Sequence, residues 1–147
     1  MLTFIHLSDI HFSSGDDGSQ FDLNQQIRNR LLADLATRPA DGAGCDALLI
    51  TGDIAYSGKK EEYEIAKQFL GEVYSRTGLS MKETYVVPGN HDVDHAHVQP
   101  TFPLWASHTE IRQHASSAHW RDTIQTQLKK DPAQLLLKPL HAYNDFA

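Results

Sequence analysis

Three short apolar runs, each ended by polar or turn-forming residues, divide the first two thirds of the chain. They lie at residues 2–8, 47–50 and 84–87, and they are rich in leucine, isoleucine and valine. Runs of this length, flanked by glycine, aspartate or proline, are typical of buried β-strands rather than of helices. The pattern therefore predicts three strands.

The segments between these strands carry helical patterns. Apolar residues recur every fourth position among charged ones at Leu23, Ile27, Leu31 and Leu35, which predicts an amphipathic helix that ends before Pro39 and covers one face of the sheet. A second helix is predicted after a charged start at 59–62 and before Gly78, with its apolar side formed by Tyr63, Ala66, Phe69, Leu70 and Val73. The order β-α-β-α-β predicts an α/β fold with a parallel sheet and right-handed crossovers.

The last third of the chain has a different character. After Asp94, Pro100 and Pro103 interrupt the chain, and no strand pattern follows. Short helices are predicted from the apolar positions Ile111, Trp120, Ile124, Leu128 and 135–137. We therefore divide the chain into an α/β unit at residues 1–95 and a helical insertion or appendage at residues 96–147.

Size and charge narrow the class of protein. With 147 residues and 40% hydrophobic content, the chain can bury a core of ordinary size. The formal net charge of -6 disfavours a broad basic surface for nucleic acid, although a local basic patch would still allow such a partner. An acidic balance also suits a site that binds cations.

Cysteine content and hydropathy bear on location. The single cysteine, Cys45, forms no internal disulfide, which favours a reducing compartment. The first residues lack the basic and apolar regions of a signal peptide, and no apolar run approaches the roughly 20 residues that span a bilayer. A cytoplasmic protein without a membrane span is expected.

Polar residues with oxygen or nitrogen donors follow directly after each predicted strand. They are Asp9 and His11 after the first strand, Asp53 after the second, and Asn90 and His91 after the third. Because the carboxyl ends of parallel strands meet at one edge of a sheet, these side chains are expected to lie close together.

The chemistry of this set favours a divalent metal. Two aspartates at adjacent strand ends repel each other unless a cation or a raised pKa compensates. Carboxylate, carboxamide and imidazole donors without thiolates suit Mn, Fe, Zn or Mg at an open catalytic position. Taken singly, an Asp-x-His or a Gly-Asp is equally well explained by a turn or a helix cap, so the interpretation depends on the three motifs occurring together.

The three motifs resemble those of the calcineurin-like metallophosphoesterases. In this chain they stand as Asp9-Ile10-His11, Gly52-Asp53 and Gly89-Asn90-His91-Asp92, and the resemblance covers residues 1–95. It implies that the chain is the amino-terminal portion of such a protein. The fold expected from the resemblance is one half of an α/β sandwich, followed by the helical insertion.

The resemblance also implies the metal ligands. Asp9 and His11 would hold a first metal ion, Asp53 would bridge two ions, and Asn90 would bind the second. A pair of ions about 3.5 to 4 Å apart holds phosphate oxygens and activates water near neutral pH. Two divalent ions are therefore expected in the complete site.

Two further residues receive catalytic roles from the same resemblance. His91 would donate to the leaving-group oxygen or to the phosphate, and Asp92 would orient its imidazole and favour its charged form. The expected activity is hydrolysis of a phosphoester, most simply a phosphodiester, by metal-activated water. A binding or scaffold module that keeps the fold without catalysis is the alternative.

The resemblance is incomplete in its second half. The family has a later lone histidine and a Gly-His-x-His motif, but Gly89 is the last glycine of this chain. His95 and His97 are the nearest candidates to replace the missing ligands. We expect the chain to be a truncated form that is inactive alone, with its exposed sheet covered by a missing carboxyl-terminal half or by a dimer partner.

Overall fold

The structure, a computed structural model, describes residues 2–15, 23–37, 45–98, 102–131 and 134–147. Within it the chain forms two compact units, which are treated separately. The α/β unit comprises Met1–Val93 and Ala142–Ala147, and the helical unit comprises Asp94–His141. Pro39 and Pro100, which were expected to end or interrupt helices, lie outside the described residues.

The α/β unit is built on a parallel sheet, as the sequence predicts. Strands β1 (Phe4–Leu7), β2 (Ala47–Thr51) and β3 (Thr84–Val87) pair in the order β1-β2-β3. Ile5 lies opposite Leu48, and Ile50 lies opposite Val86. The mixed α/β fold class is therefore confirmed, with a first strand shorter than the predicted residues 2–8.

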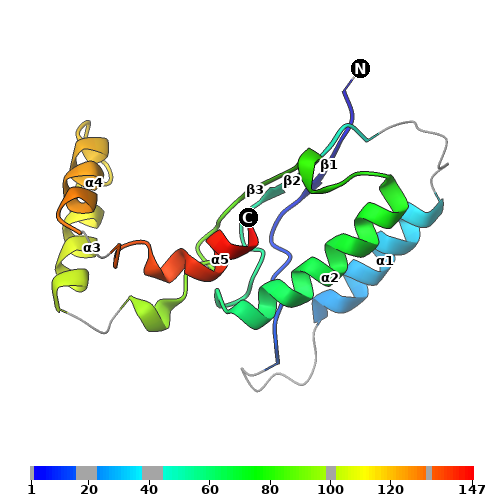
Figure 1. Cartoon of the computed structure of the whole chain (residues 1–147), viewed down its shortest axis with the longest axis horizontal. Helices are drawn as coiled ribbons and strands as arrows, with labels where there is room; N and C mark the ends of the chain where they lie inside the picture. Colours follow the sequence, from blue (N-terminus) through cyan, green and yellow to red (C-terminus); the bar gives the residue numbers. More distant parts are fainter. Residues whose placement is uncertain (1, 16–22, 38–44, 99–101, 132–133) are drawn as a thin grey trace. The chain divides into compact units, whose positions relative to one another are not determined.

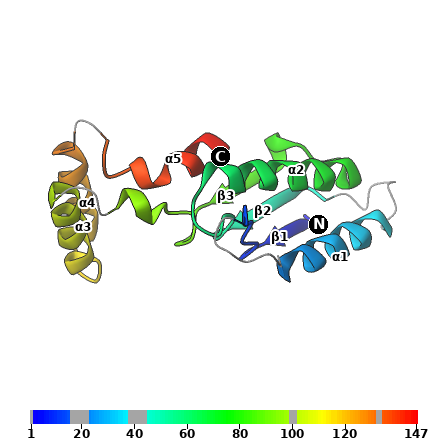
Figure 2. The ribbon, with the colours of Figure 1, turned by 90° about the horizontal axis from the view of Figure 1, so that it is seen from below.

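Two helices lie side by side over one face of this sheet, α1 (Leu23–Thr37) and α2 (Lys60–Thr77), as Figures 1 and 2 show. Successive right-handed crossovers that step in one direction across a sheet place their helices on the same face. All five apolar residues predicted for the inner side of α2 are buried. Gly78 ends α2 in the left-handed conformation with φ 73°, which glycine adopts without strain.

Helix α1 differs in detail from its prediction. Ile27 is 66% exposed, whereas Arg28 is only 8% exposed and its guanidinium lies over the Phe12 ring. A repeat of four residues advances about 40° per step around a helix of 3.6 residues per turn, so it does not define one face. The side centred on the buried Leu35 takes in Leu31 and Arg28 and leaves Ile27 outside.

The opposite face of the sheet presents apolar side chains to solvent. Phe4, Tyr85 and Val87 are 50%, 62% and 53% exposed. The His6 imidazole and the Thr51 hydroxyl, on neighbouring strands of this face, are 2.6 Å apart. The sheet is thus covered on one face and exposed on the other within the described residues.

The helical unit contains the two longer helices of the last third, α3 (Phe102–His114) and α4 (Trp120–Lys129), with the 3-10 turns η2 (His95–His97) and η3 (Lys138–Leu140). Helices α3 and α4 pack together, and the Gln127 amide donates to the Glu110 carboxylate at 2.9 Å. The helix predicted at 135–137 is wrong, because these residues form turns.

The last helix, α5 (His141–Phe146), returns almost entirely to the α/β unit. Tyr143 and Phe146 are buried, and their rings lie 6.4 and 5.1 Å from the ring of Tyr63 on α2. The functional division at residue 95 remains a prediction. Its second part, however, includes residues that the structure packs into the first compact unit.

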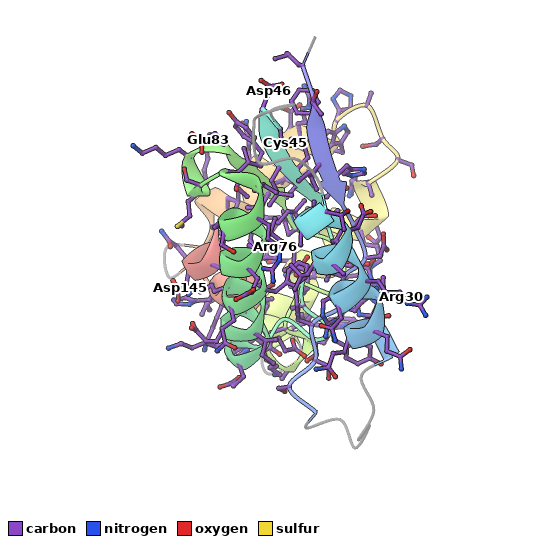
Figure 3. The ribbon with its side chains drawn as sticks, turned by 90° about the vertical axis from the view of Figure 1, so that its right-hand side faces the viewer. Arg30, Cys45, Asp46, Arg76, Glu83 and Asp145 are labelled. Atoms are coloured by element: carbon purple, nitrogen blue, oxygen red, sulfur yellow. The ribbon has the colours of Figure 1, made fainter. Side chains whose placement is uncertain are left out.

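Two hydrogen bonds between Thr3 and Asp46 join the starts of β1 and β2. Asp46, which lies next to Cys45 at the start of β2 (Figure 3), accepts a hydrogen bond from the Thr3 amide at 2.6 Å. The Asp46 amide in turn donates to the Thr3 carbonyl at 2.7 Å.

Among the helices that are described, none is long and apolar enough to cross a bilayer.

Candidate metal centre

Three loops meet at the carboxyl edge of the sheet through backbone hydrogen bonds. The Asp9 amide donates to the Gly52 carbonyl at 3.3 Å, and the His11 amide donates to the Asp53 carbonyl at 3.0 Å. The Gly52 amide donates to the Val87 carbonyl, also at 3.0 Å. The strand pairing thus continues past the strand ends and brings the predicted motifs together.

Gly89 allows the third loop to approach the second closely. A Cβ atom at Gly89 would lie 2.2 Å from Asp53 Oδ1 and 2.5 Å from the Asp53 amide nitrogen, which is shorter than any real contact. The same Asp53 Oδ1 accepts a hydrogen bond from the His91 amide at 2.9 Å. Glycine is therefore required at this position if Asp53 is to hold the His91 backbone.

Three of the predicted ligands have a strained backbone. Asp9, His11 and Asp53 adopt φ angles of 53°, 51° and 52°, and Gln134 is the one other described residue besides glycines with a positive φ. Such angles are uncommon for residues with a Cβ atom, and they concentrate at functional sites, where the surrounding structure compensates their cost. Strain at these three positions supports a functional role for this edge.

The side chains of His11, Asp53 and His91 converge at the edge. One ligand atom from each lies within 4.8 Å of the others, and all three residues are partly buried. The His11 and His91 rings pack edge to face with centroids 4.6 Å apart. Among the described residues, His11 Nδ1 is a buried ring nitrogen without a hydrogen-bond partner.

These features fit a divalent cation. Two imidazoles and one carboxylate, without a thiolate, form a donor set that suits Zn, Mn or Fe. A buried ring nitrogen without a partner carries a desolvation cost, which a ligand at the cluster can offset. The residues therefore meet the requirement for binding at least one metal ion.

The tautomer of His91 follows from one contact. His91 Nδ1 lies 2.7 Å from the carbonyl oxygen of Tyr56. Since a carbonyl oxygen only accepts, Nδ1 carries the proton, and Nε2 of the neutral ring has a free lone pair. His91 can therefore coordinate a cation through Nε2. If Nε2 is protonated instead, it can donate a hydrogen bond to an oxygen.

Asp92 does not have the contacts expected from the sequence. Its fully buried carboxylate accepts hydrogen bonds from the amides of Ile54, Ala55 and Gly89 at 3.2, 2.9 and 2.8 Å. It also accepts one from the Tyr63 hydroxyl at 2.8 Å. The expectation that Asp92 orients the His91 imidazole is therefore corrected. Its oxygens fix the backbone of both motif loops, and the contact to the His91 ring comes from Tyr56.

The surroundings of Asp92 keep the neighbouring phenol protonated. Burial, together with the negative charge of Asp92 and the hydrogen bond to it, raises the pKa of Tyr63 well above its ordinary value. Burial and, secondarily, the charge of Asp92 also raise the pKa of Tyr143. Both phenols therefore stay neutral, and the Tyr63 hydroxyl remains a donor to the buried carboxylate.

Asp9 lies outside the cluster of His11, Asp53 and His91. Asp9 and Asn90 are both exposed. Asp9 lines a cavity of about 280 Å³ beside α1, together with Asn24 and Arg28. The loops of Asp9 and Asn90 adjoin Asp53. Among the histidine, cysteine and acidic side chains that the structure describes, His11, Asp53 and His91 form the group of converging ligand atoms.

Two residues at the site were missed by the sequence analysis. Tyr56 contacts His91 through its carbonyl, and the Tyr63 hydroxyl, near the start of α2, donates to the Asp92 carboxylate. No motif marks either position. The apolar periodicity of α2 correctly predicts that Tyr63 is buried but does not indicate where its hydroxyl points.

His95 and His97 form part of a 3-10 turn in the helical unit. An extended segment would project both imidazoles to one side, as two joint ligands require, but a 3-10 turn does not have that alternation. Asp94 caps the turn by accepting from the Ala96 amide at 3.0 Å, and it lies 2.9 Å from His97 Nδ1. This contact gives His97 a local role within the helical unit.

Comparison with known proteins agrees with the motifs. The family model of calcineurin-like phosphoesterases matches residues 2–137, which extends beyond the residues 1–95 that carry the resemblance. A Bacillus subtilis protein described as an uncharacterised metallophosphoesterase-like protein, YydB, is 35% identical over 96 residues, which is 63% of this chain. The glycerophosphodiester phosphodiesterase GpdQ of Enterobacter lignolyticus is 32% identical over 100 residues, or 62% of this chain. The matched segments span only 18% and 30% of the lengths of these relatives.

Proposed function

The chain belongs to the calcineurin-like phosphoesterase family, and from this premise we propose that its strand-end residues form part of the active site of a metal-dependent phosphodiesterase. The observation that carries the proposal is the convergence of His11, Asp53 and His91 at the carboxyl edge of the sheet. Ligands in open α/β sheets bind at this edge.

We assign metal ligands by combining the family pattern with this geometry. Asp9 and His11 would hold one divalent ion, Asp53 would bridge two, and Asn90 would bind the second. Bound divalent ions polarise phosphate oxygens and lower the pKa of water. The positive φ angles at Asp9, His11 and Asp53 support this assignment, because they fix the backbone from which the ligands project. Manganese suits the oxygen-rich donor set.

The proposed role of His91 is to donate a proton from Nε2 to the leaving-group oxygen or to the phosphate. The Tyr56 carbonyl holds Nδ1 in its protonated form, which leaves Nε2 as the atom that gains and loses the second proton. Asp92 acts as a positioning residue, because its carboxylate joins the loops that carry Asp53 and His91.

A phosphodiester is the proposed substrate class. One relative is named as a glycerophosphodiester phosphodiesterase, and the formal net charge of -6 disfavours long nucleic acid as the substrate. A cytoplasmic location is also proposed, since the one cysteine, Cys45, is a free thiol.

The exposed face of the sheet supports a further part of the proposal. Its apolar side chains, among them Phe4, Tyr85 and Val87, suit burial against a second layer, supplied by another part of the protein or by a dimer partner. Since the family motifs are only half present in these 147 residues, we expect low activity and weak binding of a second ion when the chain is expressed alone.

The test is a manganese-dependent assay of the full-length protein with bis-p-nitrophenyl phosphate. Asp53→Asn should lower kcat/KM by more than about 100-fold, since even outer-shell partners of metal sites contribute about 10- to 100-fold. Asp122→Asn is the matched control, because the Asp122 side chain is 80% exposed on α4. Unchanged activity in Asp53→Asn, or full activity in EDTA, would contradict the proposal.

A further inference from the structure

The backbone of Tyr56 is fixed on both sides. Its amide donates to the Phe12 carbonyl at 3.0 Å, and its carbonyl accepts from His91 Nδ1 at 2.7 Å. The two preceding residues, Ile54 and Ala55, are completely buried. Tyr56 is therefore anchored to the rigid part of the site rather than to a free loop.

Tyr56 as a residue, in contrast, remains 45% exposed. Its ring centroid lies 5.6 Å from that of His91, with the planes tilted by 39°, and 6.2 Å from that of His11, nearly edge to face. The three rings form a continuous aromatic surface at the edge where Asp53 projects. A large, rigid and half-exposed ring beside reactive side chains is available to contact a bound molecule at little entropic cost.

From this arrangement we propose that Tyr56 is a specificity-determining residue, whose ring packs against a planar aromatic group on the substrate. The inference rests on the proposed function, because it names the class of phosphoester that this site prefers. Offset or edge-to-face packing on a tyrosine ring favours aryl or nucleobase groups over small aliphatic groups such as glycerol.

The position next to His91 indicates which part of the substrate is contacted. A group that receives a proton from His91 lies within hydrogen-bond reach of its Nε2. The organic substituent on that oxygen then extends over the neighbouring surface, where the Tyr56 ring is found. Tyr56 thus contacts the leaving group and does not touch the phosphorus.

Binding of two phosphonates tests this directly, without requiring turnover. Phenylphosphonate and methylphosphonate share one anionic head and differ in the planar ring. Calorimetry on the manganese-loaded full-length protein should show that Tyr56→Ala weakens phenylphosphonate about three- to tenfold. Binding of methylphosphonate should be unchanged, Tyr56→Phe should bind both as the wild type does, and Tyr56→Leu should resemble the alanine variant.

Kinetics on two diesters provide the second arm. For each substrate, the KM of Tyr56→Ala is divided by the KM of the wild-type protein. This ratio should exceed one for bis-p-nitrophenyl phosphate and should stay near one for glycerophosphoethanolamine. Thermal unfolding of each variant identifies a loss of folding, in which case the Phe and Leu variants still decide the question.

The outcomes separate the inference from the proposed function. An equal loss for both phosphonates in Tyr56→Ala, or unchanged binding of both, would overturn the role of Tyr56. Discrimination between the phosphonates without hydrolysis of any phosphodiester would uphold the inference and contradict the phosphodiesterase activity. If neither phosphonate binds the wild-type protein, both the inference and the proposed function are contradicted.

Discussion

The carboxyl edge of the sheet and the helical unit are held together in different ways. At the edge, backbone amides and one buried carboxylate connect the three loops, so that Asp92 alone receives four hydrogen bonds. In the helical unit, one side-chain bond joins Gln127 to Glu110, while Trp105 and Trp120 are 54% and 42% exposed. Several hydrogen bonds hold each loop at the edge, whereas fewer polar contacts join the two helices among their described residues.

This difference indicates where a single substitution has distant consequences. Strain at Asp9, His11 and Asp53 persists only if the surrounding hydrogen bonds hold it. Loss of one bond at the edge therefore affects several motif residues together. A surface change on α3 or α4 should remain local.

The largest effect is expected from Asp92→Asn. An amide of the same shape accepts at one atom only, so donors that now meet a charged carboxylate would face an NH₂ group. Hydrogen bonds to charged groups contribute about 1.5–3 kcal/mol each, and we expect a loss of about 3 kcal/mol or more in unfolding free energy. Denaturant titration measures this change.

Asp122→Asn in the helical unit is the counterpart of Asp92→Asn, with a much smaller expected loss of stability. The Asp122 carboxylate lies 3.7 Å from His119 Nδ1, and both side chains are at least 80% exposed. Exposed pairs contribute about 0–1 kcal/mol, so this variant should unfold almost as the wild type does. Similar losses in the two variants would contradict the contrast between the regions.

A smaller but still clear effect is expected from Gly89→Ala. The added Cβ would overlap Asp53 Oδ1 and the Asp53 amide, so the third loop must move away. Overpacking of this kind costs about 1–3 kcal/mol, and manganese affinity should fall with it. Calorimetry and denaturant titration on the same sample measure both changes.

Gly71→Ala is the matched control for that variant. Gly71 lies within α2, and a Cβ atom there meets nothing within 4 Å. Alanine in a helix is favoured over glycine by about 0.5–1 kcal/mol, so this variant should be slightly more stable. Destabilisation by Gly71→Ala, or tolerance of Gly89→Ala, would show that the close approach at Asp53 is not the decisive feature.

The smallest effect concerns His108 on α3. Partial burial, and secondarily the positive charge of Arg112, lower the pKa of His108 below its ordinary 6.5. The folded form therefore resists protonation, and as the pH falls below about 6.5 the unfolded chain binds the proton first. Stability should decline modestly between pH 7 and pH 5.5.

An NMR titration of the His108 imidazole measures the pKa directly, and melting at the two pH values measures the stability. His108→Gln should remove this part of the pH dependence. A His108 midpoint above 6.5, or an unchanged pH dependence in the variant, would be inconsistent with the burial of this side chain.

The fold of the α/β unit was largely predictable because its signals are local. Strand β3 and the buried side of α2 follow directly from short apolar runs and helical periodicity. The inner side of α1 was predicted less well, since a strict repeat of four hides the burial of Arg28. The turns at 135–137 were taken for helix because leucine runs do not distinguish the two.

The site was predictable as a set of loops but not as a set of contacts. An aspartate after each strand, with a glycine after the second and third, indicates which residues reach the edge. Whether Asp92 faces the His91 imidazole or the backbone amides depends on side-chain directions that only the packed structure defines. For the same reason, the contacts of Tyr56 and Tyr63 left no recognisable trace in the sequence.

The most direct test of the metal centre is a manganese titration of isotope-labelled protein followed by NMR. Paramagnetic broadening should first remove the amide signals of His11, Asp53 and His91, at substoichiometric Mn²⁺, and Asp53→Asn should abolish this selectivity. Broadening that begins at His95 and His97, or that is unchanged in Asp53→Asn, would contradict the assignment of the metal site to the carboxyl edge of the sheet.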